Sequence, residues 1–350
     1  MKIGVAPTGI LERIVAASGK APWPFLDTWF PFLYARAIMS ATKLGVFEAL
    51  EAGPLTASEV AARCGTHDGA TRTLLNTLAT TEYVRLEGER YSLAPMARRW
   101  MLRDAPRSLY DIVMHRFVDW EWMTHLEDFV RTGNALRIHE APSSDWWGVY
   151  QRAMRSLAVL TADELARRTP VPAGAKAMLD IGGSHGYYSV VLCRRHPGLR
   201  STILDLPQAI EHAAPLLAKE GMGDRVIHLG GNALTDDLGT EAYDLVLVAG
   251  LVHHFDDGRN RDLTRRIARA LRPGGYYVIH DAIRADRPRN RGIGPIVQLL
   301  DLYFAVTSEA GLWSFEEMAS WQRDAGLKPM KPVRFSLSGV GEQVGVRPGP

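Results

Sequence analysis

The stretch Met178-Leu-Asp-Ile-Gly-Gly-Ser-His-Gly-Tyr-Tyr-Ser-Val-Val-Leu192 decides the fold of this chain. It opens with an apolar run that ends at Ile181, which is typical of a buried parallel strand. A glycine-rich turn follows, and the apolar face that includes Tyr188 and Leu192 indicates that a helix begins there. A strand, a glycine turn and a helix in this order bring bare backbone and a helix N-terminus to a bound ligand.

The spacing of the turn argues for one kind of ligand. A dinucleotide-binding turn reads G-x-G-x-x-G, but Ile181 stands where its first glycine, two positions before Gly183, would be needed. The turn instead fits D-x-G-x-[G/S]-x-G, with the four matching residues Asp180, Gly182, Ser184 and Gly186. This run resembles the first motif of S-adenosylmethionine (SAM)-dependent methyltransferases. A turn that merely caps a helix is the alternative reading.

Two segments after the turn fit the same nucleoside-binding reading. The strand predicted over 201–205 ends at Asp205, and a carboxylate at that place can accept both hydroxyls of a ribose. The strand predicted over 226–229 runs into Gly230-Gly-Asn-Ala233, where Asn232 is placed to meet an adenine edge. The ordered matches therefore favour a SAM site over a simple helix cap.

The C-terminal half of the chain alternates strands and helices from a proline-marked linker at Thr169–Pro172 to about residue 336. This alternation implies an α/β fold with a doubly wound parallel sheet. The segment 271–275 is predicted to end a helix and to turn into a strand over 276–279. The tail 340–346 is predicted to form a last edge strand.

Bulk composition narrows the class of protein. The chain has 350 residues, 46% of them hydrophobic and 23% charged, so it is an ordinary globular chain long enough for two domains. A formal net charge of +2 gives no reason to expect nucleic acid or an anionic membrane as a partner. Cys64 and Cys193 are the two cysteines, and neither belongs to a CxxC pair, so we expect no disulfide framework and a cytoplasmic location. No apolar run approaches the roughly 20 residues of a membrane helix.

The N-terminal part reads as helix, turn, helix and hairpin. Residues 1–24 are predicted to be a loosely structured arm, and 25–50 to be helical. Thr56 and Glu59 have the spacing of a capping box at the start of a short helix. A second helix is predicted over 68–80, and 83–93 alternates like a hairpin around Gly88.

This order is that of a winged helix, so DNA binding is an alternative function. The predicted recognition helix offers only Arg72 as a cation, whereas phosphate contacts need several. Four further arginines, Arg98, Arg99, Arg103 and Arg107, cluster later, but such runs usually form a solvated face.

Residues 110–160 are helical in pattern and rich in aromatic side chains. Most of these side chains are expected to form core and interdomain packing. Tryptophan and methionine that face a cavity also suit a flat apolar substrate. The candidates for substrate contact are His115, Trp120 and Met154.

A second polar cluster follows the strand predicted over 243–248. The segment Ala249-Gly-Leu-Val-His-His-Phe-Asp-Asp257 lies after the carboxyl end of that strand, on the same edge of the sheet as the glycine turn. Histidine, with an unperturbed pKa of about 6.5, suits a general base. The alternative is a histidine pair that only packs or caps the loop.

With these segments in place, the chain resembles the SAM-dependent O-methyltransferase family that includes plant caffeic-acid-type enzymes and bacterial polyketide and antibiotic O-methyltransferases. The resemblance covers nearly the whole length. It implies an N-terminal winged-helix-like dimerisation domain (1–110), a helical linker and substrate-pocket segment (111–168) and a Rossmann-like SAM-binding catalytic domain (169–350). It also implies a homodimer and a small aromatic or polyketide-like substrate.

The same resemblance assigns roles to individual residues. The family's general base falls on His253, its orienting carboxylate on Asp281 and its ribose-binding acid on Asp205 within Leu204-Asp-Leu-Pro207. The cofactor-binding residues that it implies are Asp180, Gly182, Ser184, Gly186, Asp205, Leu206, Asn232, Ala233 and Ala249.

The chain departs from the family pattern in the histidine segment. His254 replaces an aspartate, Phe255 replaces a tryptophan, and Asp281 is shorter than the common glutamate. A second family glutamate falls near Leu312, where no acid stands. Despite these departures, the resemblance implies methyl transfer from SAM to a hydroxyl, in particular a phenol, as the activity.

Three other functions stay open from the sequence. Family members with an altered base can keep SAM and carry out decarboxylation or hydroxylation instead. A non-catalytic winged-helix regulator that only senses SAM is the second. Finally, His254, Asp256 and His280 formally imitate a 2-His-1-carboxylate iron site, although such sites normally lie in β-barrels.

Overall fold

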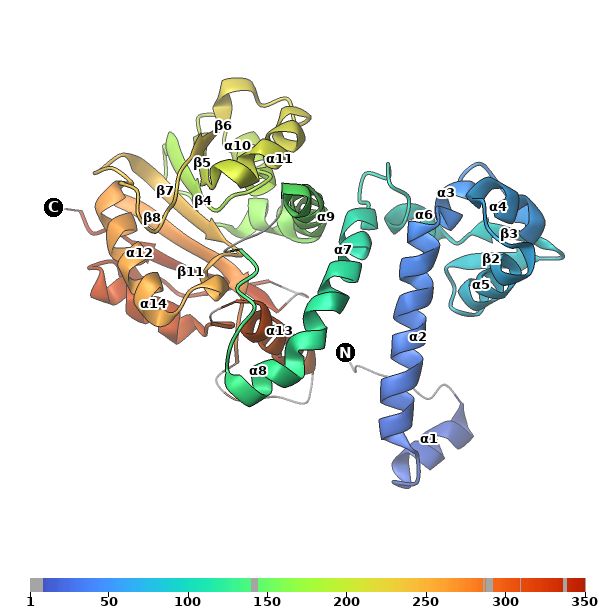
Figure 1. Cartoon of the computed structure of the whole chain (residues 1–350). Helices are drawn as coiled ribbons and strands as arrows, with labels where there is room; N and C mark the ends of the chain where they lie inside the picture. The colour runs from blue at the N-terminus through green and yellow to red at the C-terminus, as the bar shows by residue number, and fades with distance from the viewer. Residues whose placement is uncertain are drawn as a thin grey trace. The chain divides into compact units, whose positions relative to one another are not determined.

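The computed structural model describes residues 9–139, 144–285, 287, 292–308, 310–335 and 339–349. The chain divides into two compact units, residues 1–118 and 119–350, coloured from blue to green and from green to red in Figure 1. This division falls inside helix α7 (Tyr110–Trp122), whereas the domain boundaries predicted from the sequence lie after residues 110 and 168. Among the residues described, no helix is long and apolar enough to cross a membrane.

The N-terminal unit consists of helices and a small antiparallel sheet in the order β1-β3-β2. Its elements are α1 (Ile10–Ala17), α2 (Trp23–Lys43), α3 (Val46–Ala49), β1 (Leu55–Thr56), α4 (Ala57–Cys64), α5 (Asp68–Thr80), β2 (Val84–Glu87), β3 (Arg90–Leu93) and α6 (Pro95–Trp100). The predicted helix over 68–80 and the hairpin are confirmed. The predicted loose arm is wrong for α1 and for the start of α2. The capping box forms, because Thr56 N–H donates to Glu59 at 2.7 Å and the Thr56 hydroxyl accepts from Glu59 N–H at 3.3 Å.

The second unit contains an eight-stranded sheet in the order β10-β11-β8-β7-β4-β5-β6, with β9 also paired to β11. The strands are β4 (Ala177–Ile181), β5 (Arg200–Asp205), β6 (Val226–Gly230), β7 (Tyr243–Ala249), β8 (Leu271–Ala282), β9 (Lys328–Pro329), β10 (Val333–Arg334) and β11 (Val340–Val346). Strands β4 to β8 are parallel, whereas β11 runs antiparallel to β8.

Three expectations about this sheet are corrected. The sheet is mixed rather than purely parallel, and β11 is an interior strand because β9 and β10 cover its outer side. The segment 271–275 belongs to β8, and helix α12 (Asp257–Ala270) ends one residue earlier. A register shift against β7, together with Gly274 at φ +80°, lets the strand continue through residues whose proline and glycines suggested a turn.

Alternate strand residues feed two separate cores. On one face, Met178, Leu245 and Val278 pack with side chains of α9 (Ser144–Arg168), α10 (Tyr187–Arg195) and α11 (Pro207–Ala218). On the other face, Leu179 and Val246 pack with α12 and α14 (Phe315–Asp324). This is the period of two that a sheet covered by helices on both faces requires (Figure 1).

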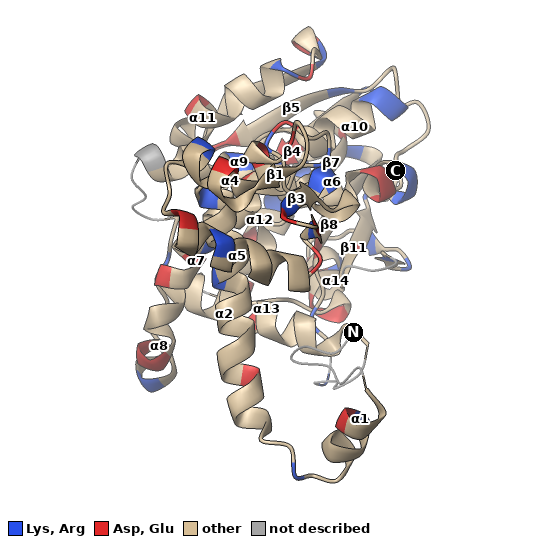
Figure 2. Ribbon diagram, turned by 90° about the vertical axis from the view of Figure 1, so that its right-hand side faces the viewer, with Lys and Arg blue, Asp and Glu red and all other residues tan. Residues whose placement is uncertain are grey.

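The remaining helices and 3-10 turns of the second unit lie between the elements named above in the chain. They are η1 (Met123–His125), α8 (Leu126–Thr132), η2 (Gly223–Arg225), η3 (Val252–His254) and α13 (Gly294–Thr307). Acidic and basic residues are interspersed along the ribbon in the view of Figure 2. Arg72, the basic residue of α5 that was weighed as a DNA contact, lies 3.9 Å from Asp68 of the same helix.

Candidate active site

A cavity of about 650 Å³ opens at the carboxyl ends of β4, β5 and β7. This volume falls within the ~300–1,000 Å³ typical of small-molecule sites. Of the sequence-predicted residues, its wall includes Met154, Gly182, Ser184, Asp205, Leu206, Asn232, Ala233 and Ala249. Loops after parallel strands meet at this edge, so residues far apart in the chain share one cavity.

The glycine turn needs its glycines for close packing. Gly182 has φ +66° and Gly186 has φ +74°, a region that other residues rarely adopt. A Cβ on Gly186 would stand 2.6 Å from Ile203, and one on Gly183 would stand 2.5 Å from the carboxylate carbon of Asp180. Gly182 and Gly183 present bare backbone to the cavity, whereas Gly186 supports the turn from outside the wall.

Asp180 lies beneath the turn and not in the cavity wall. Its Oδ2 accepts a hydrogen bond from the Ser189 hydroxyl at 2.6 Å, while its Oδ1 is buried without a partner among the described residues. Burial raises the pKa of Asp180 to about 7. The side chain therefore packs beneath Gly183 and does not itself line the cavity.

Asp205 stands at the end of β5 with its carboxylate held by backbone. Ser184 N–H donates to Oδ2 and Leu206 N–H donates to Oδ1, each at 2.7 Å. Burial raises the pKa of Asp205 to about 6, against the lowering effect of these two bonds. Each oxygen has further acceptor capacity, so the carboxylate is oriented and still able to bind two hydroxyls.

The loop after β6 forms another part of the wall. Asn232 Oδ1 accepts from Leu234 N–H at 2.9 Å, and Asn232 N–H donates to Asp236 at 2.9 Å. Ala233 is held by the Arg266 guanidinium, which donates to its carbonyl. In this stretch of wall, Asn232 and Thr235 are the polar residues beside Ala233 and Leu234.

His253 and Asp281 meet in the interior. Nδ1 of His253 lies 2.8 Å from Oδ1 and 2.9 Å from Oδ2 of Asp281, and the histidine ring packs on Phe304 with centroids 3.8 Å apart. Asp281 accepts from Ala282 N–H as well, at 2.7 Å. Contact through Nδ1 leaves Nε2 as the ring nitrogen that does not face Asp281.

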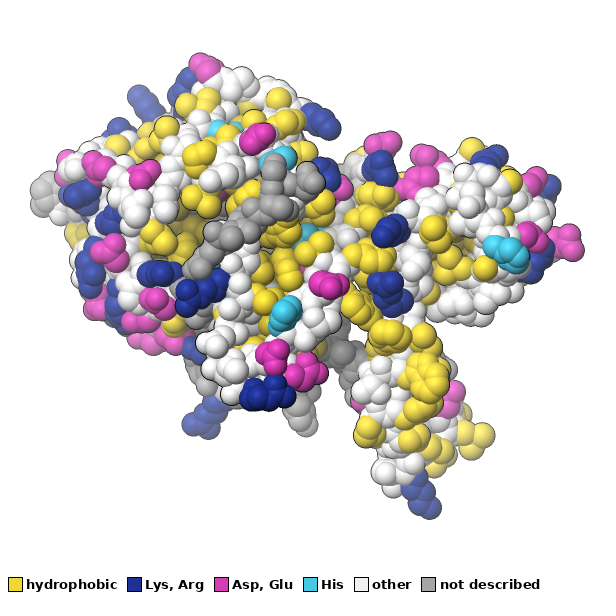
Figure 3. All heavy atoms as spheres, viewed as in Figure 1, with side chains coloured by type: hydrophobic (Ala, Val, Ile, Leu, Met, Phe, Trp, Pro, Cys, Tyr) yellow, Lys and Arg dark blue, Asp and Glu magenta, His cyan; other side chains and the backbone are white. Residues whose placement is uncertain are grey.

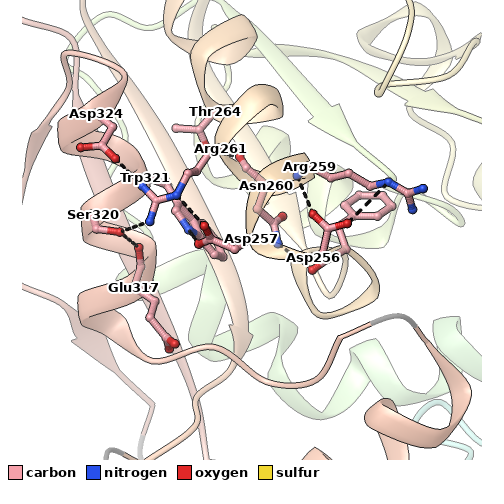
Figure 4. A network of polar contacts seen from close by, with 11 residues as sticks. Asp256, Asp257, Arg259, Asn260, Arg261, Thr264, Glu317, Ser320, Trp321 and Asp324 are labelled. Carbon is pink, nitrogen blue, oxygen red and sulfur yellow. Dashed lines mark hydrogen bonds and ion pairs between the residues drawn. The ribbon is translucent and has the colours of Figure 1, made fainter. Parts of the chain in front are cut away.

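Polar side chains bind the backbone of the histidine turn η3, and two residues that flank it, Asp256 and Asn260, are labelled in Figure 4. The buried Asn260 amide donates to the carbonyls of Val252 at 3.0 Å and Phe255 at 2.9 Å. Trp313 Nε1 donates to the same Val252 carbonyl at 3.0 Å. Asp256 caps α12 by accepting from Arg259 N–H at 2.8 Å. The turn that carries both histidines is therefore fixed at each end.

The wider network of Figure 4 ties α12 to α14. Arg261 donates to Asp257 at 2.6 Å and to Ser320 at 3.2 Å, and it also pairs with Asp324. Trp321 Nε1 donates to Asp257 at 2.7 Å. The start of α12, which follows the histidine turn directly, is thereby anchored to a second helix.

The cavity wall contains His254, whereas His253 is not part of it. His254 Nδ1 lies 2.6 Å from the Ser308 hydroxyl, and burial with the neighbouring His253 and His139 lowers the pKa of His254 well below its usual range. His139 and Ser308 also line the cavity. Sequence reasoning missed both, because neither stands in a motif or after a predicted strand.

The three predicted substrate residues lie in different places. Met154 lines the cavity on the face of α9 that also carries Trp147, Tyr150, Gln151 and Leu157. This spacing of three and four residues is the one signal that could have predicted the whole helix face. His115 is buried on α7 in the first unit, Trp120 follows the division between the units, and neither belongs to this cavity wall. Their contact with a substrate stays a prediction.

The iron reading fails on geometry. Asp256 caps α12, and His280 Nδ1 instead lies 3.1 Å from the buried Glu342. Within the part of the chain that the structure describes, no group of three or more His, Cys, Asp or Glu side chains is arranged to hold a metal ion. The family's second glutamate was expected to fall near Leu312. At that place, the Leu312 N–H donates to the carboxylate of Asp301 at 2.8 Å.

Comparison with known proteins gives the family. Residues 131–327 match the model of the O-methyltransferase domain, and residues 26–103 match that of the O-methyltransferase dimerisation domain. The chain is 27% identical over 87% of its length to a 3-hydroxy-5-methyl-1-naphthoate 3-O-methyltransferase of Streptomyces sahachiroi, covering 89% of that protein. It is 29% identical over 84% of its length to a mitomycin biosynthesis 6-O-methyltransferase of Streptomyces lavendulae, covering 85% of it.

Solved structures agree on the fold. Human N-acetylserotonin methyltransferase in complex with SAM superposes with a TM-score of 0.83 at 19% identity, covering 99% of this chain and 100% of that one. The mitomycin 7-O-methyltransferase MmcR superposes with a TM-score of 0.77 at 26% identity, covering 97% and 100%. Because the domain model spans more than half of the sequence, the chain belongs to the O-methyltransferase family, as its motifs predict.

Proposed function

We propose that this enzyme transfers a methyl group from SAM to a hydroxyl of a small aromatic or polyketide-like substrate, with His253 as general base. The observation that carries the proposal is the buried contact of His253 with Asp281. His253 stands on the same short turn as His254, which lines the cavity. The relatives support the acceptor class, since their names specify a naphthoate and mitomycin biosynthesis as contexts of O-methylation.

The residues in the cavity fit SAM. Asp205 offers an oriented carboxylate for the ribose hydroxyls, and the backbone of Gly182 and Gly183 lies open to the methionyl end. Leu206 and Ala233 provide apolar wall for an adenine, with Asn232 for its polar edge. SAM supplies a methyl group already activated by its sulfonium. The protein therefore has to orient the acceptor, exclude water and move one proton.

His253 is the group that moves the proton. With Nδ1 donating to Asp281, Nε2 carries the lone pair and accepts the proton of the acceptor hydroxyl as the oxygen attacks. Asp281 stabilises the imidazolium that results, since the carboxylate is in contact through both oxygens. Phe304 keeps the ring in one plane by packing against it.

The test is product analysis with purified protein and SAM. Incubation with a panel of phenols is expected to yield products heavier by one methylene unit, with S-adenosylhomocysteine formed in equal amount. Loss of carbon dioxide or gain of one oxygen would replace the proposal by the decarboxylase or hydroxylase alternative. Aromatic amines belong in the same panel, because the N,N-dimethyltransferase OxyT of Streptomyces rimosus is also 28% identical over 90% of this chain.

The assembly that we propose is a homodimer through the N-terminal unit. Hydrophobic side chains gather on α1 and α2 at the lower right of Figure 3, and Ile10, Leu11 and Trp29 are 77%, 78% and 53% exposed. So much apolar surface is unusual on a monomer. Light scattering at micromolar concentration is expected to give twice the chain mass. The substitutions Leu11→Asp and Trp29→Asp, which place a charge on this apolar surface, should yield monomers, and a wild-type monomer would contradict the assignment.

A further inference from the structure

One tryptophan contacts the two segments that carry His253 and Asp281. The indole Nε1–H of Trp313 donates to the carbonyl of Val252 at 3.0 Å, and Val252 is the residue directly before His253. The backbone of Trp313 forms an isolated parallel bridge with Ile283, two residues after Asp281. Trp313 therefore joins the histidine turn η3 to the end of β8.

The chain on both sides of Trp313 is held by helices. Ser314, the next residue, is the N-cap of α14. Its N–H donates to the Glu317 carboxylate at 2.8 Å, and its hydroxyl accepts from Glu317 N–H at 3.3 Å. On the other side, Leu312 N–H donates to Asp301 of α13 at 2.8 Å. The position of the indole is therefore set by a segment that is anchored to two helices.

The Val252 carbonyl accepts two hydrogen bonds, and the two donors tie it to different parts of the fold. Asn260, eight residues along the chain, binds the carbonyls of Val252 and Phe255 and so holds the turn to α12. Trp313 stands 61 residues from Val252, and its own carbonyl accepts from Arg284 N–H, after β8, at 3.0 Å. Trp313 therefore fixes the turn relative to β8, whereas Asn260 fixes it relative to its own helix.

The contact between His253 and Asp281 depends on a narrow separation. Nδ1 of His253 lies 2.8 and 2.9 Å from the two carboxylate oxygens, and a contact stretched to about 3.6 Å is no longer a hydrogen bond. An aspartate has one methylene fewer than a glutamate, so its carboxylate has less reach if the turn shifts. Leu312, where the resemblance places a second acid, has no polar side-chain group that could hold the histidine instead. The separation therefore depends on groups that hold the backbone of the turn.

We propose that Trp313 is a positioning residue for the general base. Its indole N–H and its backbone hold η3 at the separation from β8 at which Asp281 meets His253 through both oxygens. This inference rests on the proposed function, since it takes His253 as the base. Loss of the indole N–H lets the turn move away from β8. The contact with Asp281 then lengthens, and the carboxylate gives less support to the imidazolium that forms during the reaction.

The experiment compares Trp313→Phe with Trp321→Phe. Each substitution removes one indole N–H and keeps an aromatic ring, and the two tryptophan rings pack on each other with centroids 5.1 Å apart. Trp321 Nε1 donates to Asp257 at 2.7 Å, so the control loses a hydrogen bond of the same kind that does not touch η3. Thermal unfolding and calorimetry with SAM establish that both variants are folded.

The first readout is turnover of 2-naphthol. Trp313→Phe is expected to lower kcat by about three- to tenfold, the scale of one neutral hydrogen bond, while KM for SAM stays unchanged. The loss should shrink with 4-nitrophenol, which ionises more readily and depends less on a base. Trp321→Phe should leave kcat close to the wild-type value. Trp313→His keeps a ring N–H, so it should recover part of the loss and serves as the folded comparison if Trp313→Phe does not fold.

The second readout needs no turnover. The ring proton that His253 shares with Asp281 is buried, so it should give a downfield proton resonance that exchanges slowly with water and is absent in His253→Ala. Trp313→Phe should speed this exchange by about three- to tenfold, and Trp321→Phe should not. Equal exchange rates and equal kcat in the two phenylalanine variants would overturn the inference. A changed exchange rate in an enzyme that methylates no phenol would refute the proposed function alone.

Discussion

His253 and Asp281 form a two-point contact in which one imidazole nitrogen faces both carboxylate oxygens, at 2.8 and 2.9 Å. The two side chains are only 7% and 4% exposed. Asp281 lies at the end of β8 and His253 on the turn after the adjacent β7, so the pairing of these strands brings the two side chains together. An aspartate therefore reaches His253, although the family commonly has a longer glutamate there.

The first prediction concerns the base. His253→Ala should leave SAM affinity unchanged, because Asp205 and the glycine turn, not His253, line the proposed SAM site. Turnover should fall by about 10²–10⁴, the usual range for a lost general base. The loss should be smallest for acidic phenols and should shrink as pH rises, since an ionised acceptor needs no base. Steady-state kinetics across pH, with calorimetry for SAM, measures both effects.

Two further variants control this prediction. His254→Ala should reduce turnover much less, because His254 contacts Ser308 and has no carboxylate partner. Asp281→Asn should lower turnover while SAM affinity stays intact, and Asp281→Glu should restore part of it. If His254→Ala proves the more damaging change, the base is assigned one residue too early. If neither histidine matters, positioning alone carries the reaction.

The second prediction concerns the ribose-binding acid. Asp205→Ala should weaken SAM binding by about 2–3 kcal/mol, the scale of hydrogen bonds to a charged group. The measurement is calorimetric titration with SAM, and Asp237→Ala serves as control, since Asp237 is an exposed carboxylate paired with Arg269 outside the cavity. An unchanged affinity in Asp205→Ala would remove Asp205 from the SAM site.

The third prediction concerns stability against pH. The pKa of Asp180 is raised from 3.8 to about 7 by burial, so between these values the folded state binds more protons than the unfolded state. Stability therefore falls as pH rises through that window, and the ionised carboxylate costs roughly 4 kcal/mol at most above it. Asp180→Asn removes this titration and can still accept from Ser189.

Thermal unfolding at pH 5 and pH 8 tests this effect. The buried histidines act in the opposite direction, because the pKa of His185 is lowered to about 3 and folding is favoured as they lose their protons. The comparison is therefore between wild type and variant, which share those histidines. Asp180→Asn should lose less stability, or gain more, than wild type from pH 5 to pH 8. Identical pH profiles would show that Asp180 does not titrate in this range.

The fourth prediction concerns the support of the histidine turn. Asn260→Ala removes both bonds to the carbonyls of Val252 and Phe255 and leaves them buried, which should destabilise the fold by about 1–3 kcal/mol. It should also lower turnover at unchanged SAM affinity, because the base loses its fixed position. Arg261→Ala is the matched control, because it removes contacts of the same helix with α14 that are partly exposed. Equal kinetic effects of the two variants would show that Asn260 has no special part in holding the turn.

The sequence by itself determined the family and the location of the ligand edge. Periodicity and glycine spacing are local properties, so the strand, turn and helix around Gly182 could be predicted, as could the helix over 68–80 and the hairpin after it. The acid at Asp205 could be predicted because a parallel strand carries its last residue to the same edge as the glycine turn.

Tertiary structure decided the rest. The side of β8 on which β11 lies depends on pairing between strands distant in sequence, and no local pattern distinguishes an interior strand from an edge one at 340–346. Which partner each histidine contacts was likewise decided by pairing between segments distant in the sequence. His253 is directed at Asp281 by the pairing of β7 with β8. His254 contacts Ser308, directly after α13, while the last carbonyls of α13 accept from the backbone just before His139. Such contacts join residues from 28 positions apart, for His253 and Asp281, to 115 apart, for His139 and His254, and only the packed chain brings them within reach of one another.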